Sequence, residues 1–309
     1  MGMIRLQIQI LVFLVIGWVF GKKQWITRDA ASQLNFLVMN LILPCSIFSA
    51  FLSPPDSETL QASASILVLA ILLQGVFWLV SRFLWKSIKD PAERTNLEYG
   101  TVSNNAGTLG MVIGQAAFGT SGMLYTSIYS IPLRIVMWSY GVTLYNRQSG
   151  VSGKALLKKV VTHPCMIAIF LGLIFMLGQP YGLLLPDLMR STIAALGSCN
   201  TVLIMIVIGV ILSDLPLKDL FGKTIVAYTL IRLILIPAAV LAGLALFQIG
   251  GMPLKICVLE SAMPAPVTMA MLSQKYHCKE SFSSRMIFLS TALSMLTLPV
   301  WTLVLQTFF

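Results

Sequence analysis

The feature that most constrains this chain is a series of apolar segments that follow one another from end to end. Each has at least 17 residues, about the length an α-helix needs to cross a membrane. Only 10% of the residues are charged, against roughly 25% in soluble domains. We therefore predict an all-α polytopic membrane protein with ten transmembrane helices. The predicted spans are residues 4–20, 31–52, 60–82, 96–118, 122–145, 162–178, 188–212, 223–247, 253–273 and 283–307.

Lysine and arginine gather in every second connection between these spans. The odd-numbered connections hold 16 of the 21 basic residues, and the even-numbered ones hold Asp56, Glu58 and Asp187. By the positive-inside rule the odd connections are cytoplasmic, so both termini are expected on the non-cytoplasmic side of the cell (inner) membrane. The net charge of +10 then reports topology beside anionic membrane lipid, and nucleic acid is not an expected partner. The 16 residues are Lys22, Lys23, Arg28, Arg82, Lys86, Lys89, Arg94, Arg147, Lys154, Lys158, Lys159, Lys218, Lys223, Lys275, Lys279 and Arg285.

The ten spans divide into two halves of five. A polar stretch at 146–161, expected as a cytoplasmic linker, separates residues 1–145 from residues 162–309. An odd number of spans in each half places the second half upside down relative to the first, as in many secondary transporters. A shift of 156 residues places interruptions of one half on interruptions of the other. We expect a 5+5 inverted repeat.

Two spans at matching places in the halves carry helix-breaking residues. The fourth span contains SNNAGTLG, and the ninth contains two prolines separated by one residue, each of which removes a backbone donor. Backbone freed at membrane depth must face protein or water, so we expect helices 4 and 9 to break and cross beside a substrate. A purely structural role in packing or kinking is the alternative. The candidate substrate-binding residues here are Ser103, Asn104, Asn105, Thr108, Pro264 and Pro266.

Three ionisable residues lie deep in predicted spans, where each needs a partner or water. They are Arg134, Arg232 and Glu260. In one interpretation an arginine binds a carboxylate substrate, and Glu260 carries a proton or pairs with that arginine when the site is empty. In the other, Glu260 pairs with an arginine and only holds helices together. Both interpretations stay open on the sequence.

Motifs for enzymatic chemistry are missing from the sequence. It has no Walker loop, no HExxH pair and no GxSxG nucleophile, so ATP hydrolysis, metalloprotease chemistry and acyl transfer lack their residues. The five cysteines are scattered and do not form a zinc-ligand pattern. We expect no enzyme activity, no cofactor and no metal site.

Three stretches resemble the auxin efflux carrier family, which includes plant PIN-FORMED auxin exporters and bacterial carriers. They are NFLVMNLILPCSIFSAF (35–51), SNNAGTLGMVIGQAAFGTSGMLYTSIYSI (103–131) and ESAMPAPVTMAMLSQKYHC (260–278). The resemblance follows the whole chain in span order. Many plant members have a long cytoplasmic loop where this chain has 16 residues, so a bacterial member is expected.

The resemblance implies a scaffold of spans 1, 2, 6 and 7, which usually dimerises, and a transport domain of spans 3–5 and 8–10. It also implies that Asn104 or Asn105 binds the substrate carboxylate and that Pro264 is the crossover proline of span 9. The expected function is secondary active transport, in the direction of export, of small organic anions such as auxin-like or dicarboxylic acids. The alternatives are a non-transporting membrane sensor or subunit with a transporter fold, and a sodium-coupled organic anion symporter.

Overall fold

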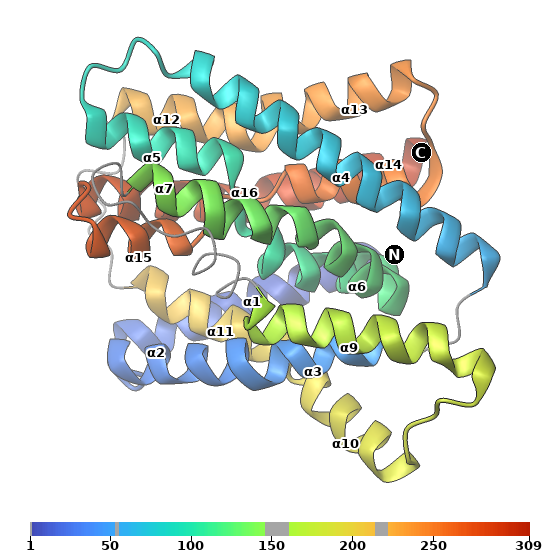
Figure 1. Cartoon of the computed structure of the whole chain (residues 1–309). Coiled ribbons are helices and arrows are strands. Elements are labelled where there is room, and N and C mark those ends of the chain that lie inside the picture. The colour runs from blue at the N-terminus through green and yellow to red at the C-terminus, as the bar shows by residue number, and fades with distance from the viewer. Residues whose placement is uncertain (1, 53–55, 146–160, 214–221) are drawn as a thin grey trace. The chain divides into compact units, whose positions relative to one another are not determined.

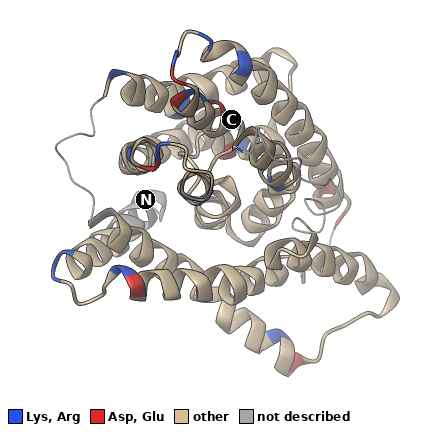
Figure 2. Ribbon diagram, turned by 60° about the vertical axis from the view of Figure 1, so that its left-hand side comes forward, with Lys and Arg blue, Asp and Glu red and all other residues tan. Residues whose placement is uncertain are grey.

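Helices form every regular element in the described part of the chain. The computed structural model describes residues 2–52, 56–145, 161–213 and 222–309. The linker predicted at 146–161 lies, apart from its last residue, outside these ranges, as does Lys218. Figure 2 shows that charged residues gather mainly at helix ends and connections, as expected when long apolar stretches lie in lipid.

Six helical stretches in the described residues are long and apolar enough to cross a membrane. Several predicted spans are divided into shorter helices, as described below, so length and hydropathy by themselves give fewer than the ten predicted spans. The six stretches are Arg28–Ala50, Ser57–Leu84, Pro164–Tyr181, Asp187–Ile211, Lys223–Leu246 and Glu280–Phe308.

The chain divides into two compact units, and each unit combines segments from both halves of the sequence. Unit 1 comprises residues 1–60, 112–127 and 162–216. Its helices are α1 (Gly2–Lys22), α2 (Arg28–Leu37), the π-helical η1 (Val38–Ile42), α3 (Leu43–Ala50), α9 (Pro164–Gly178), the 3₁₀ turn η4 (Gln179–Tyr181), α10 (Asp187–Ser198) and α11 (Asn200–Ser213).

In unit 1, α1 and α11 lie side by side (Figure 1). A side chain on Gly17 of α1 would overlap the backbone of Ile206, and one on Gly209 of α11 would overlap the backbone of Leu14. Small residues allow membrane helices to approach this closely, and van der Waals packing then takes the place of the hydrophobic effect, which lipid cannot supply.

Unit 2 comprises residues 61–111, 128–161 and 217–309. Most of its elements come from the second half of the chain, but the helices on either side of the SNNAGTLG stretch (103–110) come from the first half. Its elements are α4 (Ser57–Leu84), α5 (Pro91–Val102), the 3₁₀ turn η2 (Asn105–Gly107), the π-helical η3 (Met137–Gly141), α7 (Val142–Tyr145), α12 (Lys223–Leu230), the π-helical η6 (Ile231–Leu235), α13 (Ile236–Leu246), α14 (Gly251–Ser261), α15 (Thr268–Lys275) and α16 (Glu280–Phe308).

The remaining helix, α6 (Leu109–Val136), contains a sharp reversal at Gly119. Gly119 has φ 68° and ψ −150°, a conformation that only glycine adopts without strain. The reversal falls in the predicted connection between the fourth and fifth spans. Gly114 and Gly122 on its two sides are so close that a side chain on Gly122 would overlap the Gly114 carbonyl.

Candidate functional site

The first interruption, called here the first break, covers residues 103–108. It begins where α5 ends at Val102, and both Ser103 and Asn104 are extended, the latter with φ −144° and ψ −178°. The Asn104 side-chain oxygen accepts a hydrogen bond from the Ala106 amide at 3.0 Å. Short polar side chains of this kind compete with helical hydrogen bonds and favour caps and turns. The chain therefore makes one 3₁₀ turn, η2, before α6 begins at Leu109.

The second break covers residues 262–267, between α14 and α15. Pro264 and Pro266 are both buried and have no amide hydrogen to donate. Ala265 lies between them, and its amide donates to the hydroxyl of Ser290 on α16 at 3.1 Å. The two prolines and this serine together leave few unpaired donors in a segment that no helix satisfies.

The two breaks are in direct contact within unit 2. The Asn105 amide donates to the Pro264 carbonyl at 2.9 Å. The side-chain amide of Asn104 donates to the Glu260 carbonyl at 2.6 Å. Asn104 is 3% exposed and Asn105 is 7% exposed, so these bonds form in a nearly dry interior.

Arg232, in the π-helical segment η6, binds the ends of both half-helices. Its guanidinium donates to three carbonyls at 3.0 to 3.1 Å. Because a helix C-terminus carries a partial negative charge, a cation here stabilises both ends while it remains 1% exposed. The three carbonyls belong to Thr101 near the end of α5, to Ser261 at the end of α14 and to Met263 in the second break.

Arg134, on α6, contacts the first break from another direction. Its terminal nitrogen donates to the Gly107 carbonyl, and the residue is 4% exposed. Its Nε has no hydrogen-bond partner among the described residues. Arg134 therefore retains a buried donor beside η2.

Glu260, in the last turn of α14, is fully buried, and neither carboxylate oxygen has a hydrogen-bond partner among the described residues. No described ion pair joins it to Arg134 or Arg232. The carboxylate lies against Gly110, where an added methyl group would overlap it. An unpaired buried carboxylate costs several kcal/mol, so this site favours a bound cation or proton.

The remaining candidates lie in or beside the breaks. Ser103 is fully buried, whereas Thr108, directly before α6, is partly exposed. The side chain of Asn105 forms no hydrogen bond with any described residue. Arg232 binds carbonyls at the ends of α5 and α14 and one in the second break, and Arg134 binds the first break.

Sequence reasoning missed several residues that hold the end of α5, directly before the first break. Gln74 on α4 donates to the Val102 carbonyl at 2.7 Å, and Tyr228 on α12 donates to the Gly100 carbonyl at 2.9 Å. Trp85 donates to the hydroxyl of Thr101 at 2.9 Å. A glutamine in the middle of an apolar span was a usable signal for such a role, because a buried amide needs partners.

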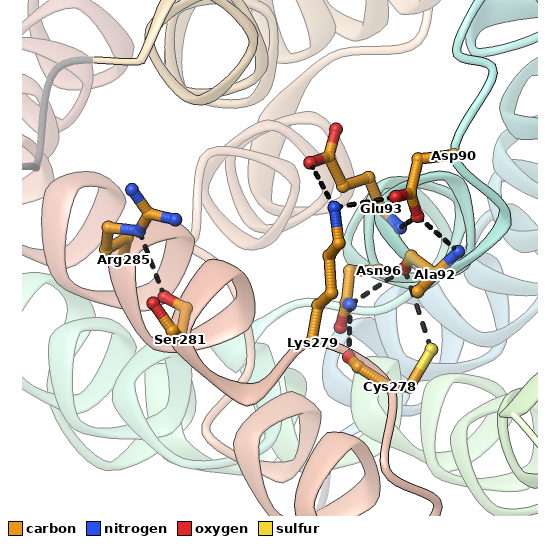
Figure 3. Close-up of polar contacts among 8 residues, drawn as sticks. All are labelled: Asp90, Ala92, Glu93, Asn96, Cys278, Lys279, Ser281 and Arg285. Carbon is orange, nitrogen blue, oxygen red and sulfur yellow. Dashed lines mark hydrogen bonds and ion pairs between the residues drawn. The ribbon is translucent and has the colours of Figure 1, made fainter.

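The opposite end of α5 is attached to the loop before α16 (Figure 3). Lys279 contacts Asp90 at 2.6 Å and Glu93 at 2.9 Å. Asn96 donates to the Ala92 and Cys278 carbonyls, both at 2.9 Å, and accepts from Tyr145 and Ser273. These contacts fix the beginning of α5 independently of the break at its end.

The Lys279 hydrogen bond, supported by the Glu93 amide, holds the pKa of Asp90 below its ordinary value. Hydrogen bonds to Asp90 and Glu93 raise the pKa of Lys279. The described residues contain no group of three or more His, Cys, Asp or Glu side chains suited to a metal ion.

Comparison with known proteins identifies the family. Residues 3–302 match the family described as "Membrane transport protein". An uncharacterized transporter of Methanothermobacter thermautotrophicus is 26% identical over 308 residues, which cover 99% of each chain. The uncharacterized transporter YfdV of Escherichia coli is 23% identical over 305 residues, 94% of each chain.

The uncharacterized transporter MJ1031 of Methanocaldococcus jannaschii is 24% identical over 297 residues, which cover 94% of this chain and 95% of that protein. These matches extend over nearly the full length, as the resemblance in the three quoted stretches predicted. The chain belongs to the membrane transport protein family, the auxin efflux carrier family, and is a multi-pass membrane transporter.

Proposed function

We propose that this protein is a secondary active carrier that exports small organic anions, such as auxin-like or dicarboxylic acids, by alternating access. The substrate carboxylate binds at the crossover formed by the two breaks. The carboxylate is held by the side chain of Asn105, by Arg134 and by the first amides of α6, whose N-terminal end carries a partial positive charge.

The observation that carries this proposal is that two donor groups, the Asn105 side-chain amide in the first break and the Arg134 Nε beside it, have no partner among the described residues. Asn104 uses both ends of its amide within the protein, whereas the Asn105 side chain binds no described residue. The unpaired Nε of Arg134 belongs to the same side chain that contacts Gly107 in η2. A buried donor without a partner, such as the Arg134 Nε, is costly, and an anion bound between it and the Asn105 side chain satisfies it.

For the architecture, we propose ten spans arranged as two inverted halves of five. The correspondence of the two breaks supports this. Val102 and Ser261, the ends of α5 and α14, are 159 residues apart, as are Leu109 and Thr268, where the next helices begin. The halves thus match at these breaks with an offset three residues larger than the 156 used in the sequence comparison.

We further propose that spans 1, 2, 6 and 7 form a scaffold that dimerises and that spans 3–5 and 8–10 carry the substrate. The helices of those scaffold spans all fall in unit 1, together with residues 112–127, and both breaks fall in unit 2. Cross-linking of cysteine pairs introduced in α1 tests the dimer, because a monomer yields no linked species.

We propose Glu260 as the residue that couples transport to a cation. Its carboxylate is fully buried without a described hydrogen-bond partner, which favours either a proton or a sodium ion at this position. Sodium-coupled symport is therefore the second candidate function. Sodium dependence of flux favours it, and pH dependence without sodium dependence favours a proton.

Transport in proteoliposomes tests the substrate site. Asn105→Ala is expected to lower counterflow of accepted acids at least tenfold, while Asn40→Ala, an exposed asparagine of η1 that bonds only the Phe36 carbonyl, serves as the matched control. A thermal-shift screen of mono- and dicarboxylates, including indole-3-acetate, chooses the acids. Unchanged flux of every accepted acid in Asn105→Ala would rule out this site.

Transport measured against pH and sodium concentration tests the coupling role. Glu260→Gln is expected to flatten the dependence on the coupling ion while substrate binding by thermal shift persists. If the variant and the parent protein give identical profiles, Glu260 has only a structural role.

We propose that both termini lie on the non-cytoplasmic side of the cell (inner) membrane. Alkaline phosphatase fused after Phe309 is expected to be active, because that enzyme folds only outside the cytoplasm. An inactive fusion with an active cytoplasmic reporter at the same place would reverse the orientation.

A further inference from the structure

A cavity of about 580 Å³ in unit 2 lies apart from both breaks and has no role in the proposed transport site. It opens at the end of α4, beside the beginning of α5 and near α7. We call it the basic hollow, because three of its side chains are cationic. It is lined by Arg82, Phe83, Lys86, Arg94, Glu98, Tyr140, Thr143 and Leu144.

The charges of the basic hollow do not balance. Arg94 is paired with Glu98 at 2.7 Å, but neither Arg82 nor Lys86 has an ion-pair partner among the described residues. Aromatic rings hold both of them: the Arg82 guanidinium lies 4.4 Å from the Trp78 ring centre, and the Lys86 ammonium lies 4.3 Å from that of Phe83. Two positioned cations without a counter-ion favour an anionic ligand.

A second cavity, of about 320 Å³, adjoins the basic hollow through Tyr140, which lines both. We call it the apolar groove. It runs between α4 and the last part of α6, and its one amide, that of Gln74, is already bound to the Val102 carbonyl. The groove is lined by Ile71, Gln74, Gly75, Trp78, Pro132, Ile135, Val136 and Tyr140.

Trp78 and Tyr140 lie where the two cavities meet. Their rings are 6.3 Å apart in an edge-to-face arrangement, and the Arg82 guanidinium lies over both. Tryptophan and tyrosine concentrate at the level of lipid headgroups. The outer face of α4 at this level is apolar and exposed, with Leu79 at 52% and Phe83 at 60%, as expected for contact with acyl chains.

We propose that the basic hollow and the apolar groove together bind one anionic phospholipid. The phosphate of its headgroup pairs with Arg82 and Lys86, and an acyl chain of the same molecule fills the groove past Trp78. A soluble phosphate or carboxylate satisfies the two cations but leaves the adjoining groove unexplained, whereas a lipid accounts for both cavities. Basic pockets between membrane helices are known lipid headgroup sites.

Native mass spectrometry of the detergent-solubilised protein with phosphatidylglycerol or phosphatidylcholine tests the headgroup. Retention of phosphatidylglycerol is expected to exceed that of phosphatidylcholine, and the double substitution Arg82→Gln, Lys86→Gln is expected to weaken it about tenfold. The matched control is Lys22→Gln, Lys23→Gln. It removes two cations that also lie near tryptophan rings but line neither cavity. Equal loss in both double variants would overturn the proposal.

Gly75 provides the test of the acyl chain. A Cβ atom added there meets no atom within 4 Å, and Gly75 lines the groove, so the side chain of Gly75→Leu is expected to occupy the groove. It is expected to weaken phosphatidylglycerol retention while thermal stability without lipid stays unchanged. Inorganic phosphate or glycerol phosphate that competes as well as the lipid, or retention unaffected by Gly75→Leu, would contradict a lipid and indicate a soluble anion.

Discussion

The first break and the second break differ in the polar groups that they offer for hydrogen bonds. The first break, built from asparagines and glycine, contributes donors: the Asn104 side chain and the Asn105 amide. The second break, built around prolines, has lost donors, and the Pro264 carbonyl within it and the Glu260 carbonyl in the last turn of α14 accept them. Each break therefore satisfies what the other lacks.

This difference explains why a cation is buried where the breaks meet. Two helices that end at the same place present a surplus of carbonyls, and the prolines of the second break add to it by removing amides. Arg232 supplies the missing donors to Thr101, Ser261 and Met263. Arg232 thereby holds the ends of α5 and α14 together, and the donors that remain for a ligand are the Asn105 side-chain amide and the Arg134 Nε.

The largest effect on stability is expected from replacing Arg232, whose guanidinium donates to carbonyls at the ends of both α5 and α14. Arg232→Met deletes three charge-assisted hydrogen bonds and leaves buried carbonyls unpaired, so it should lower the free energy of unfolding by about 3 to 5 kcal/mol. Thermal unfolding in detergent measures the loss. Arg190→Met is the matched control, because that exposed arginine makes one long bond, 3.5 Å, to the Leu52 carbonyl.

The next test separates the two asparagines of the first break. Asn104→Ala removes the bond to Glu260 and the cap on Ala106 and is expected to cost about 1 to 3 kcal/mol of stability. Asn105→Ala keeps the backbone bond to Pro264 and loses no described side-chain bond, so its stability should stay near that of the parent. Equal melting temperatures for the two variants would mean that Asn104 does not join the breaks.

A smaller effect is expected at the second break. Ser290→Ala leaves the Ala265 amide without its acceptor, so it should cost about 1 kcal/mol more than Ser294→Ala. Ser294 is equally buried but bonds only within its own helix, to Thr291. Chemical denaturation of both variants gives the difference, and a result with the order reversed would show that Ala265 finds another partner.

The smallest effect is expected far from the breaks, at Asp90. Its pKa is lowered in the folded protein, so its stabilisation is complete above the unfolded pKa of about 4. That stabilisation is lost as the pH falls through the lower folded value. Asp90→Asn should therefore melt slightly earlier than the parent at pH 7 and equally at strongly acidic pH. A gap that persists in acid would mean that the charge of Asp90 is not the cause.

The raised pKa of Lys279 has the opposite dependence. The contribution of its pairs is complete below the ordinary lysine pKa near 10.4 and is lost as the pH rises through the higher folded value. The ion pairs of Lys279 with Asp90 and Glu93, which attach α5 to the loop before α16, should therefore persist when the pH changes around neutrality.

The positions of both breaks could be predicted from the sequence, since Asn104, Asn105, Pro264 and Pro266 are poor in helices for local reasons. The partners of the arginines could not. Arg232 binds backbone carbonyls, and a sequence shows where charges are but not where helices end in space. Ser290 was equally hidden, because serine is frequent in these helices and only its contact with Ala265 distinguishes it.

The membership of residues 112–127 in unit 1 also escaped sequence reasoning. Residues 112–127 cluster with unit 1, while the residues before and after them cluster with unit 2. Hydropathy assigns each predicted span to one group as a whole. In the structure only the part of α6 around the reversal at Gly119 belongs to unit 1. Such a division depends on contacts between distant segments, which a single sequence does not contain.

The contact between Gly110 and Glu260 has a consequence for how this family diverges. One methyl group at position 110 would occupy the space of the carboxylate, so the two positions are constrained together. Relatives with alanine or a larger residue at 110 should carry a shorter or uncharged residue at 260, and those with glycine are free to keep glutamate. An alignment in which the two positions vary independently would show that the carboxylate has room to move elsewhere.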